Sequence, residues 1–259
     1  PASISLHGPQ ASARFAVQQI DPQADGAIIG PQITDDLTIS SLDSQVARVD
    51  QGRVIAVGDG HTELIVERDG AELARVPIDV TETSATQRWQ FTAHIQSILA
   101  RSGCNSGACH GALAGKGGFR LSLHGYDSVS DHFSITRQDR GRRIEPADPG
   151  RSLLLSKPTM LIAHKGGLRM QSDSDDYRAL AEWIAAGSSG PQTPETDAPL
   201  ERIEVLPAQL QLSTADQQQL IVRAHYADGR CEDVTHWAKF TSTNAVVAAV
   251  DEHGRITIA

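Results

Sequence analysis

Apolar and polar positions alternate differently at the two ends of the chain and in its middle. Near the N-terminus, residues 75–80 alternate with a period of two, and residues 53–57 and 63–66 are short β-branched runs separated by a glycine-containing turn. This pattern is typical of short, half-buried strands joined by tight turns. It predicts an antiparallel β-sandwich over the first part of the chain.

The last part of the chain repeats this pattern. The motif Ser-x-x-x-x-Val-Ala-x-Val-Asp, followed by Gly-x-Val or Gly-x-Ile, occurs within residues 41–54 and again within residues 241–256. Val49 and Val250 occupy equivalent positions, 201 residues apart. Such a repeat predicts two copies of one module on either side of the middle. The second copy ends at Ala259, before the strands that complete the first, so we expect it to be truncated.

The middle of the chain begins and ends with helical patterns. Apolar residues recur every three to four positions within residues 87–100, and Gly103 follows as a C-terminal signal. A second helix is predicted to begin at Ser174, with two acidic residues in its first turn, and to end at Gly187. Roughly 70 glycine-rich residues with little periodicity lie between them. Such a segment is uncommon unless it is functional, and a cofactor would hold it in place.

Composition and charge indicate several globular domains. Hydrophobic residues make up 39% of the 259 positions and charged residues 21%. No apolar run approaches the roughly 20 residues of a membrane span. The net charge of −9 is divided into −8 over residues 1–85, +4 over residues 86–187 and −5 over residues 188–259. We therefore expect three units with different roles. No part is strongly basic and aromatic residues make up only 4%, which argues against nucleic-acid binding.

Two of the three cysteines stand beside a histidine in the irregular middle segment. Cys104, Cys109 and His110 form a Cys-x4-Cys-His motif. In c-type cytochromes, a Cys-x2-Cys-His motif attaches haem through both thiols and ligates its iron through the histidine. The longer spacing requires two residues to bulge out, for which Gly107 and Ala108 are small enough. The alternatives are a disulfide or a chance pair beside a core histidine, and a three-ligand zinc site in an awkward geometry.

Longer stretches around this motif resemble a known family. Residues 103–111, 115–123, 125–127, 146–154 and 164–169 are similar to the planctomycete-type cytochrome c domain, in its Cys-x4-Cys-His variant. That family occurs in large secreted multidomain proteins. The resemblance implies one covalent haem c per chain, bound through Cys104 and Cys109 as thioethers.

The two flanking segments resemble bacterial Ig-like domains of group 2. The resemblance rests on the repeated motif and on the stretch from Tyr226 to Thr235. Together the resemblances imply a multidomain chain in which all-β Ig-like sandwiches flank a mainly α-helical c-type cytochrome domain. The expected domains are residues 1–84, 85–190 and 199–259.

Several residues are candidate ligands of the haem iron. His110 is the proximal ligand because it adjoins Cys109. His164 begins a His-Lys-Gly-Gly stretch that matches the family pattern, and it is favoured as the distal ligand. Met170, which precedes the second helix, is the distal alternative, and His124 ranks third. Methionine ligation raises the reduction potential, whereas two histidines usually give a lower one.

These residues predict an extracytoplasmic electron-transfer module rather than an enzyme. Covalent haem is normally attached outside the cytoplasm, so we expect a periplasmic or cell-surface location, with a signal peptide that is not part of these 259 residues. Alternatives are a surface adhesion or scaffold protein with a structural or sensory haem, and a redox module that feeds a catalytic domain elsewhere. Expected partners are a redox protein and, through the Ig-like domains, a cell-surface polysaccharide or protein. Cys231 is a spare thiol without an assigned role.

Overall fold

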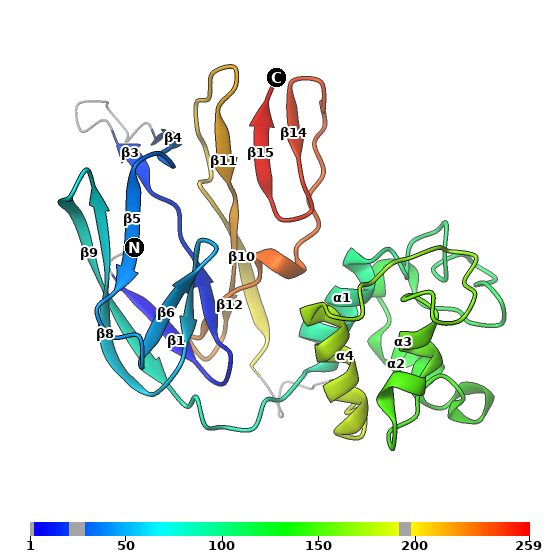
Figure 1. Cartoon of the computed structure of the whole chain (residues 1–259). Coiled ribbons are helices and arrows are strands. Elements are labelled where there is room, and N and C mark those ends of the chain that lie inside the picture. The colour runs from blue at the N-terminus through cyan, green and yellow to red at the C-terminus, as the bar shows by residue number, and fades with distance from the viewer. Residues whose placement is uncertain (1–2, 21–28, 192–197) are drawn as a thin grey trace. The chain divides into compact units, whose positions relative to one another are not determined.

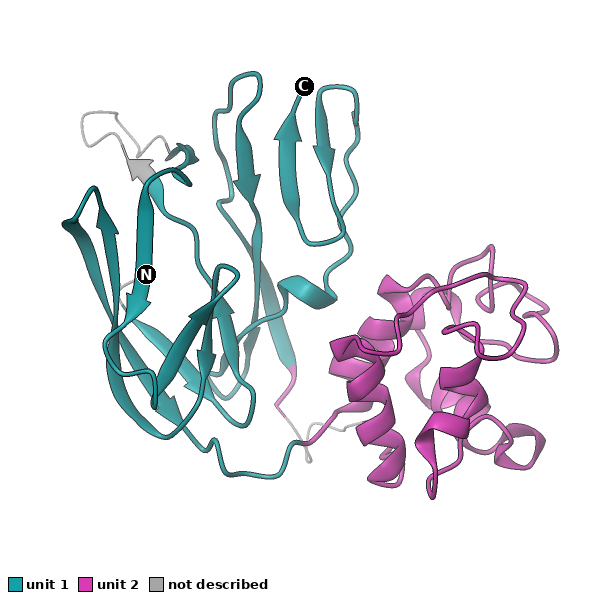
Figure 2. Cartoon of the chain, in the orientation of Figure 1, with its two compact units in different colours: residues 1–87, 200–259 teal, residues 88–199 magenta. Residues whose placement is uncertain are grey.

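The computed structural model describes residues 3–20, 29–191 and 198–259. The chain divides into two compact units: residues 1–87 with 200–259 form unit 1, and residues 88–199 form unit 2 (Figure 2). Unit 1 is built from β-sheets and unit 2 contains short helices (Figure 1). Within the described residues, no helix is long and apolar enough to span a bilayer.

The N-terminal segment of unit 1 forms two main sheets. The larger has the strand order β1 (Ile4–His7), β9 (Ala71–Thr81), β8 (Gly60–Arg68) and β5 (Leu37–Ser41), with only β1 and β9 parallel. The smaller has the order β2 (Ser12–Arg14), β7 (Arg53–Ala56) and β6 (Ala47–Asp50). A further pair, β3 (Gln18–Ile20) and β4 (Ile29–Gln32), is antiparallel. These strands include the runs predicted from alternation.

A single apolar cluster lies between these two sheets. Leu6, Leu64 and Ile78 contribute from the larger sheet, and Ala47 and Val54 from the smaller, each at most 3% exposed. Successive residues of a strand point to opposite faces, so alternation supplies one apolar face to each sheet. The segment therefore has the layered packing of two sheets over a shared core.

The C-terminal segment of unit 1 forms two three-stranded sheets. One has the order β10 (Leu200–Leu206), β12 (Ile221–Tyr226) and β13 (Cys231–Asp233). The other has the order β11 (Gln217–Gln219), β15 (Arg255–Ile258) and β14 (Ala248–Val250). A 3₁₀ turn, η5 (Thr235–Trp237), follows β13.

The sequence repeat corresponds to two hairpins with the same register. Val49 pairs with Val54 across β6 and β7, and Val250 pairs with Ile256 across β14 and β15. The match extends beyond the strands, because the N–H of Val57 donates to the carbonyl of Val46 and the N–H of Ala259 donates to that of Val247 (2.9 and 3.1 Å). The extra residue of the second copy is therefore absorbed in the turn without changing the pairing.

Glutamine side chains connect the two segments of unit 1. Gln18 Nε2 donates to Gln218 Oε1 at 2.9 Å, and the backbone N–H of Gln219 donates to Gln32 Oε1 at 2.8 Å. Gln218 is fully buried. The two copies of the repeat thus belong to one compact unit, whereas the sequence alone suggests two domains that are distant along the chain.

Unit 2 has helices as its regular structure, but they are short. They are a π-helical turn η1 (Phe91–Ile95) and the helices α1 (Gln96–Arg101), α2 (Ser128–Thr136), α3 (Leu153–Ser156) and α4 (Asp175–Ala185). The 3₁₀ turns are η2 (Leu123–Gly125), η3 (Gln138–Gly141) and η4 (Pro149–Arg151). The expectation of a mainly α-helical domain is therefore met only in part, because turns and irregular segments occupy most of unit 2.

The two helices predicted from sequence are present. The first begins at Phe91 rather than residue 87 and opens with a π-helical turn. The second begins where Ser174 Oγ accepts a hydrogen bond from the N–H of Tyr177 (3.2 Å), and it ends before Gly187, whose φ is +93°. Phe91 and Trp183 pack with ring centroids 5.7 Å apart in the core of the unit.

Candidate functional site

The end of α1 determines where Cys104 lies. Gly103 has a φ of +73°, which only glycine adopts readily. The N–H of Gly103 donates to the carbonyl of Ala100 (3.0 Å) and the N–H of Cys104 donates to that of Leu99 (2.8 Å). These two bonds form a Schellman motif, in which the residue after the left-handed glycine turns away from the helix axis. That residue is the first cysteine.

The segment from Cys104 to Gly111 closes on itself. The N–H of His110 donates to the carbonyl of Cys104 at 2.9 Å, so these seven residues form a closed loop. A Cβ at Gly111 would lie 2.0 Å from the carbonyl oxygen of Asn105, so only glycine fits there. Gly107 and Ala108 are exposed, as expected of the two additional residues in the long motif. We call residues 104–111 the attachment loop.

The His110 side chain is oriented by the backbone that follows the attachment loop. Its Nδ1 donates to the carbonyl of Phe119 at 3.0 Å, and the two rings lie 4.6 Å apart between centroids. Phe119 is itself held by a backbone pairing with Lys116 and by the guanidinium of Arg143, which lies 4.6 Å from its ring centroid. Burial lowers the pKa of His110, which favours the neutral ring.

Arg143 is a buried support for this arrangement. Its guanidinium donates to the carbonyls of Ser134 (2.9 Å) and Gly118 (2.8 Å) and pairs with Asp139 at 2.7 Å. Its exposure is only 6%. The guanidinium group of Arg143 is therefore bonded within unit 2 and is not exposed to solvent.

The His164 side chain is oriented in the same manner from the opposite part of unit 2. Its Nδ1 donates to the carbonyl of Gly167 at 3.0 Å. A Cβ at Gly166 would lie 2.7 Å from Cε1 of the imidazole, so the ring rests directly on the glycine backbone. The two glycines therefore have different roles. Gly167 accepts the hydrogen bond from His164, and Gly166 leaves room for the imidazole ring because it has no Cβ.

The imidazoles of His110 and His164 lie close to each other with nearly parallel planes. Their ring centroids are 6.3 Å apart and their planes differ by 12°. A backbone carbonyl only accepts, so the proton of each neutral ring lies on Nδ1 and the lone pair lies on Nε2. Metal-binding histidines in proteins are commonly held by this kind of Nδ1–H to carbonyl bond.

The distance between the two rings can be compared with that of two imidazoles on one metal. Two metal–nitrogen bonds of about 2 Å and two nitrogen-to-centroid distances of about 1.2 Å would separate the centroids by about 6.4 Å, provided that both Nε2 atoms point toward the metal. The observed separation is 6.3 Å. Two histidines beside a pair of thiols are the residue types that would hold a covalently bound haem.

The two thiols of the attachment loop differ from a disulfide pair because both residues are free cysteines of intermediate exposure. Burial raises the pKa of Cys104 to about 11, and the charge of Cys109 contributes in the same direction. Within the described ranges, no three His, Cys, Asp or Glu residues cluster closely enough to hold a bare metal ion.

The other candidate ligands lie in different surroundings. Met170 is 6% exposed in the apolar core, with its N–H directed to the carbonyl of Pro158. His124 is exposed and lies in a turn with a φ of +56°. The structure therefore brings His164, and not these two, into a ring pair with His110.

Several residues of the site carry no signal in a single sequence. Phe119 and Gly167 contribute backbone carbonyls, which accept hydrogen bonds from the two histidines. Arg143 is one of four arginines within residues 137–143, and nothing in the sequence distinguishes it from the other three. Arg143 is buried, so it is not a surface cation although it belongs to this arginine-rich stretch. Only the glycines beside His164 are recognisable in the sequence, because glycine allows the backbone to approach a ring or ligand closely.

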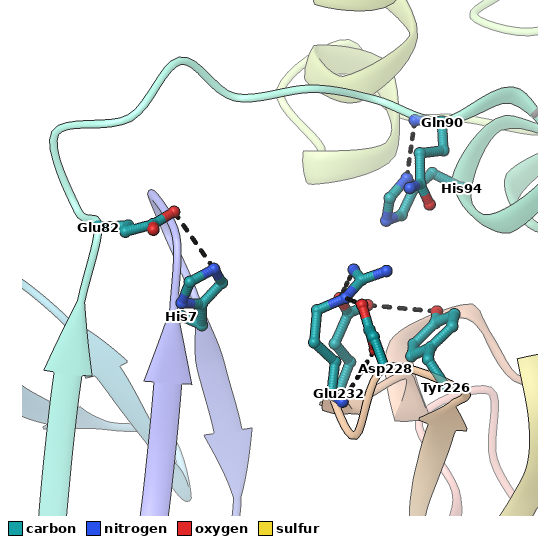
Figure 3. A network of polar contacts seen from close by, with 8 residues as sticks. His7, Glu82, Gln90, His94, Tyr226, Asp228 and Glu232 are labelled. Atoms are coloured by element: carbon teal, nitrogen blue, oxygen red, sulfur yellow. Dashed lines mark hydrogen bonds and ion pairs between the residues drawn. The ribbon is translucent and has the colours of Figure 1, made fainter. Parts of the chain in front are cut away.

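Histidines and cations outside the ring pair make local polar contacts (Figure 3). In unit 1, His7 pairs with Glu82 at 3.2 Å, and the turn that ends at Glu232 holds an arginine between two carboxylates. In unit 2, the N–H of Gln90 donates to Nδ1 of His94 at 2.9 Å, which caps the start of the first helix. These side chains have structural partners already.

Comparisons with known proteins add little to this geometry. No protein-family model matches the chain, and no curated protein matches it. Among solved structures it is similar to one titled "Structure of the S-layer protein SbsC, domains 5-6", with 12% identity and a TM-score of 0.30, over 100% of this chain and 79% of that chain. A TM-score of this size does not establish a shared fold. The functional argument therefore rests on the side chains of the site.

Proposed function

We propose that unit 2 is a c-type cytochrome module that binds one haem covalently and transfers electrons within a larger extracytoplasmic protein. Cys104 and Cys109 would hold the haem as thioethers, and His110 and His164 would be its axial ligands. The observation that supports the proposal is the pair of imidazoles 6.3 Å apart between centroids, each bonded through Nδ1 to a backbone carbonyl so that Nε2 is not used by these bonds. In this proposal the flanking β-segments are Ig-like modules.

The bound haem would supply a reversible one-electron couple. The chain's own residues supply the rest: two carbonyls fix the imidazole rings, and the attachment loop holds both thiols beside His110. With His110 and His164 both bound to its iron, the haem would have no free position for a substrate. This donor set supports electron transfer more than catalysis, and imidazole in place of methionine favours a lower potential.

Exposed apolar side chains near both histidines support the same assignment. Leu113 is 88% exposed, three residues after His110. Leu161 and Leu168 are 76% and 53% exposed, within four residues of His164 on either side. Large apolar side chains in this number are costly in water, and a largely apolar porphyrin edge would cover them.

The test is haem attachment in the full chain, exported to the periplasm of a host that carries a c-type maturation system. We expect a pyridine haemochrome spectrum of c-type haem at one equivalent per chain, retained after acid–acetone extraction. The Cys104→Ser/Cys109→Ser variant should lose the covalent haem, whereas Cys231→Ser, as the matched control, should keep it. A folded wild-type protein without covalent haem would overturn the proposal.

The β-rich unit 1 favours a second candidate, a surface scaffold that carries a structural or sensory haem. Most of the described strands belong to unit 1, and none of its side chains joins the ring pair. Carbon monoxide distinguishes the candidates: a sensory haem binds it readily when reduced, whereas a six-coordinate electron-transfer haem does not. A haem that is not reversibly reduced in a redox titration would favour a structural role.

A further inference from the structure

In unit 2, basic and acidic residues lie largely in different segments of the chain. The segments that carry the two imidazoles, residues 102–126 and 149–172, contain no aspartate or glutamate. Their basic residues are Lys116, Arg120, Arg151, Lys157, Lys165 and Arg169. All acidic residues between positions 86 and 187 lie in residues 127–148 and 173–182. The charge around the site is therefore positive although the chain carries −9 overall.

Two of these cations have contacts close to the attachment loop or to His164. A guanidinium nitrogen of Arg169 is 3.8 Å from the position that a Cβ would take at Gly103, directly before the attachment loop. Lys157 Nζ donates to the carbonyl of Ala163 at 3.2 Å, one residue before His164. The two basic segments thus meet at the same place as the imidazoles.

Five of these six cations, all except Lys157, are exposed. Lys116, Arg120, Lys165 and Arg169 are the four exposed cations that lie within ten residues of His110 or His164 along the chain. Among the acidic residues of the other segments, Asp131 is buried against Ser122, Asp139 pairs with Arg143, and Asp176 pairs with Arg101. We call Lys116, Arg120, Lys165 and Arg169 the basic rim.

We infer that the basic rim docks an acidic redox protein over the haem edge. This inference rests on the proposed function. A positive rim around the redox centre would attract and orient a negatively charged partner, even though the net charge of the chain would repel it. The two propionates of a haem would not cancel the four cations of the basic rim. In each transfer one electron would leave the reduced iron for the oxidised partner, with no bond made or broken.

The test measures the sign of the field at the haem with small redox probes. The reduced full chain, with haem attached, is mixed in a stopped-flow instrument with anionic ferricyanide or with the cationic tris(phenanthroline)cobalt(III). Ionic strength is raised from about 0.01 M to about 1 M, which shortens the screening length from about 30 Å to about 3 Å. We expect the ferricyanide rate to fall about tenfold and the cobalt rate to rise.

Charge-reversal variants locate the effect. Lys116→Glu/Lys165→Glu should lower the low-salt ferricyanide rate at least about threefold and flatten its salt dependence. Arg137→Glu/Arg142→Glu changes the net charge equally, but in the segment that also contains acidic residues, and should have a smaller effect. Midpoint potentials are measured in parallel to separate driving force from attraction.

The outcomes separate the two claims. A protein without covalent haem would overturn the proposed function and this inference with it. A protein with haem whose ferricyanide rate rises with salt, as the net charge alone would dictate, would overturn only the basic rim. Equal effects of the two charge-reversal pairs would do the same.

Discussion

In unit 1, apolar side chains at alternate strand positions lie between two sheets, and regular backbone ladders connect the strands. In unit 2, by contrast, glycines, backbone carbonyls and a buried arginine set the path of long irregular segments. The fold of unit 1 follows from its apolar core. The irregular segments of unit 2 carry the two thiols and bring the two imidazoles together.

The difference shows what each unit depends on. A sheet sandwich is stabilised by burial spread over many residues, so single positions are replaceable within limits. A loop that closes around a prosthetic group depends on a few backbone positions where a Cβ cannot fit. Substitutions should therefore act in different ways in the two units, and the following variants of the full chain test that contrast in order of expected effect.

The largest effect is expected for Gly111→Ala. The added Cβ would lie 2.0 Å from the carbonyl oxygen of Asn105, so the attachment loop must open. We expect a loss of about 4 kcal/mol or more in the stability of unit 2, together with loss of haem attachment. Gly150→Ala is the control, because its nearest neighbour, Tyr177 Oη, is 3.4 Å from the added atom. Equal haem yields from the two variants would contradict the role of Gly111.

In unit 1, Leu64→Ala should be next in size. Leu64 is 2% exposed within the shared core of the sheets, so its truncation leaves a cavity. We expect a loss of about 3 kcal/mol in the unfolding of unit 1, with the haem absorption spectrum of unit 2 unchanged. Leu42→Ala, at a position that is 61% exposed, should be close to neutral. A changed haem spectrum in the Leu64 variant would mean that the units are not energetically separate.

A smaller effect is expected at the ion pair that ties α1 to α4. Arg101 and Asp176 are 2.9 Å apart, with side chains only 19% and 13% exposed. Asp176→Asn should reduce the stability of unit 2 by about 1–2 kcal/mol in denaturant titrations. Asp175→Asn, which affects an exposed pair with Arg178, should cost less than about 0.5 kcal/mol. Similar losses for both would remove any special role for the partly buried pair.

The smallest effect on stability, with a clear spectroscopic signature, is expected for Gly166→Ala. Its φ is not in the left-handed region, so alanine suits the backbone, but the methyl group would lie 2.7 Å from the His164 ring. We expect less than about 1 kcal/mol of destabilisation and a partial shift of the haem from low spin to high spin. Gly190→Ala places a methyl group 3.6 Å from the ring of His132 and should leave the spectrum unchanged.

Much of the fold follows from local patterns. The period-two runs, the repeated hairpin and the helix after Ser174 depend on neighbouring residues, and these elements are where the patterns place them. The sequence does not predict that residues 1–87 and 200–259 form one compact unit. That association involves contacts such as the one between Gln18 and Gln218, which are 200 positions apart. A glutamine has no pattern that reveals its partner.

The sequence singles out the two histidines that the structure pairs, but not the groups that orient their rings. Adjacency identifies His110, and the glycines after His164 single it out. The carbonyls that orient the rings belong to Phe119 and Gly167, and a backbone acceptor is present at every residue of a chain. The buried Arg143 looked like any other member of an arginine run, because burial is a property of the tertiary fold.

The most direct test of the account is the axial ligation of the haem. Visible and electron paramagnetic resonance spectra are compared for the haem-loaded wild type, His164→Ala and Met170→Ala. The ring pair predicts that the wild type and Met170→Ala are low spin with two histidine ligands, while His164→Ala becomes high spin and binds carbon monoxide when reduced. A low-spin spectrum that survives in His164→Ala and is lost in Met170→Ala would contradict it.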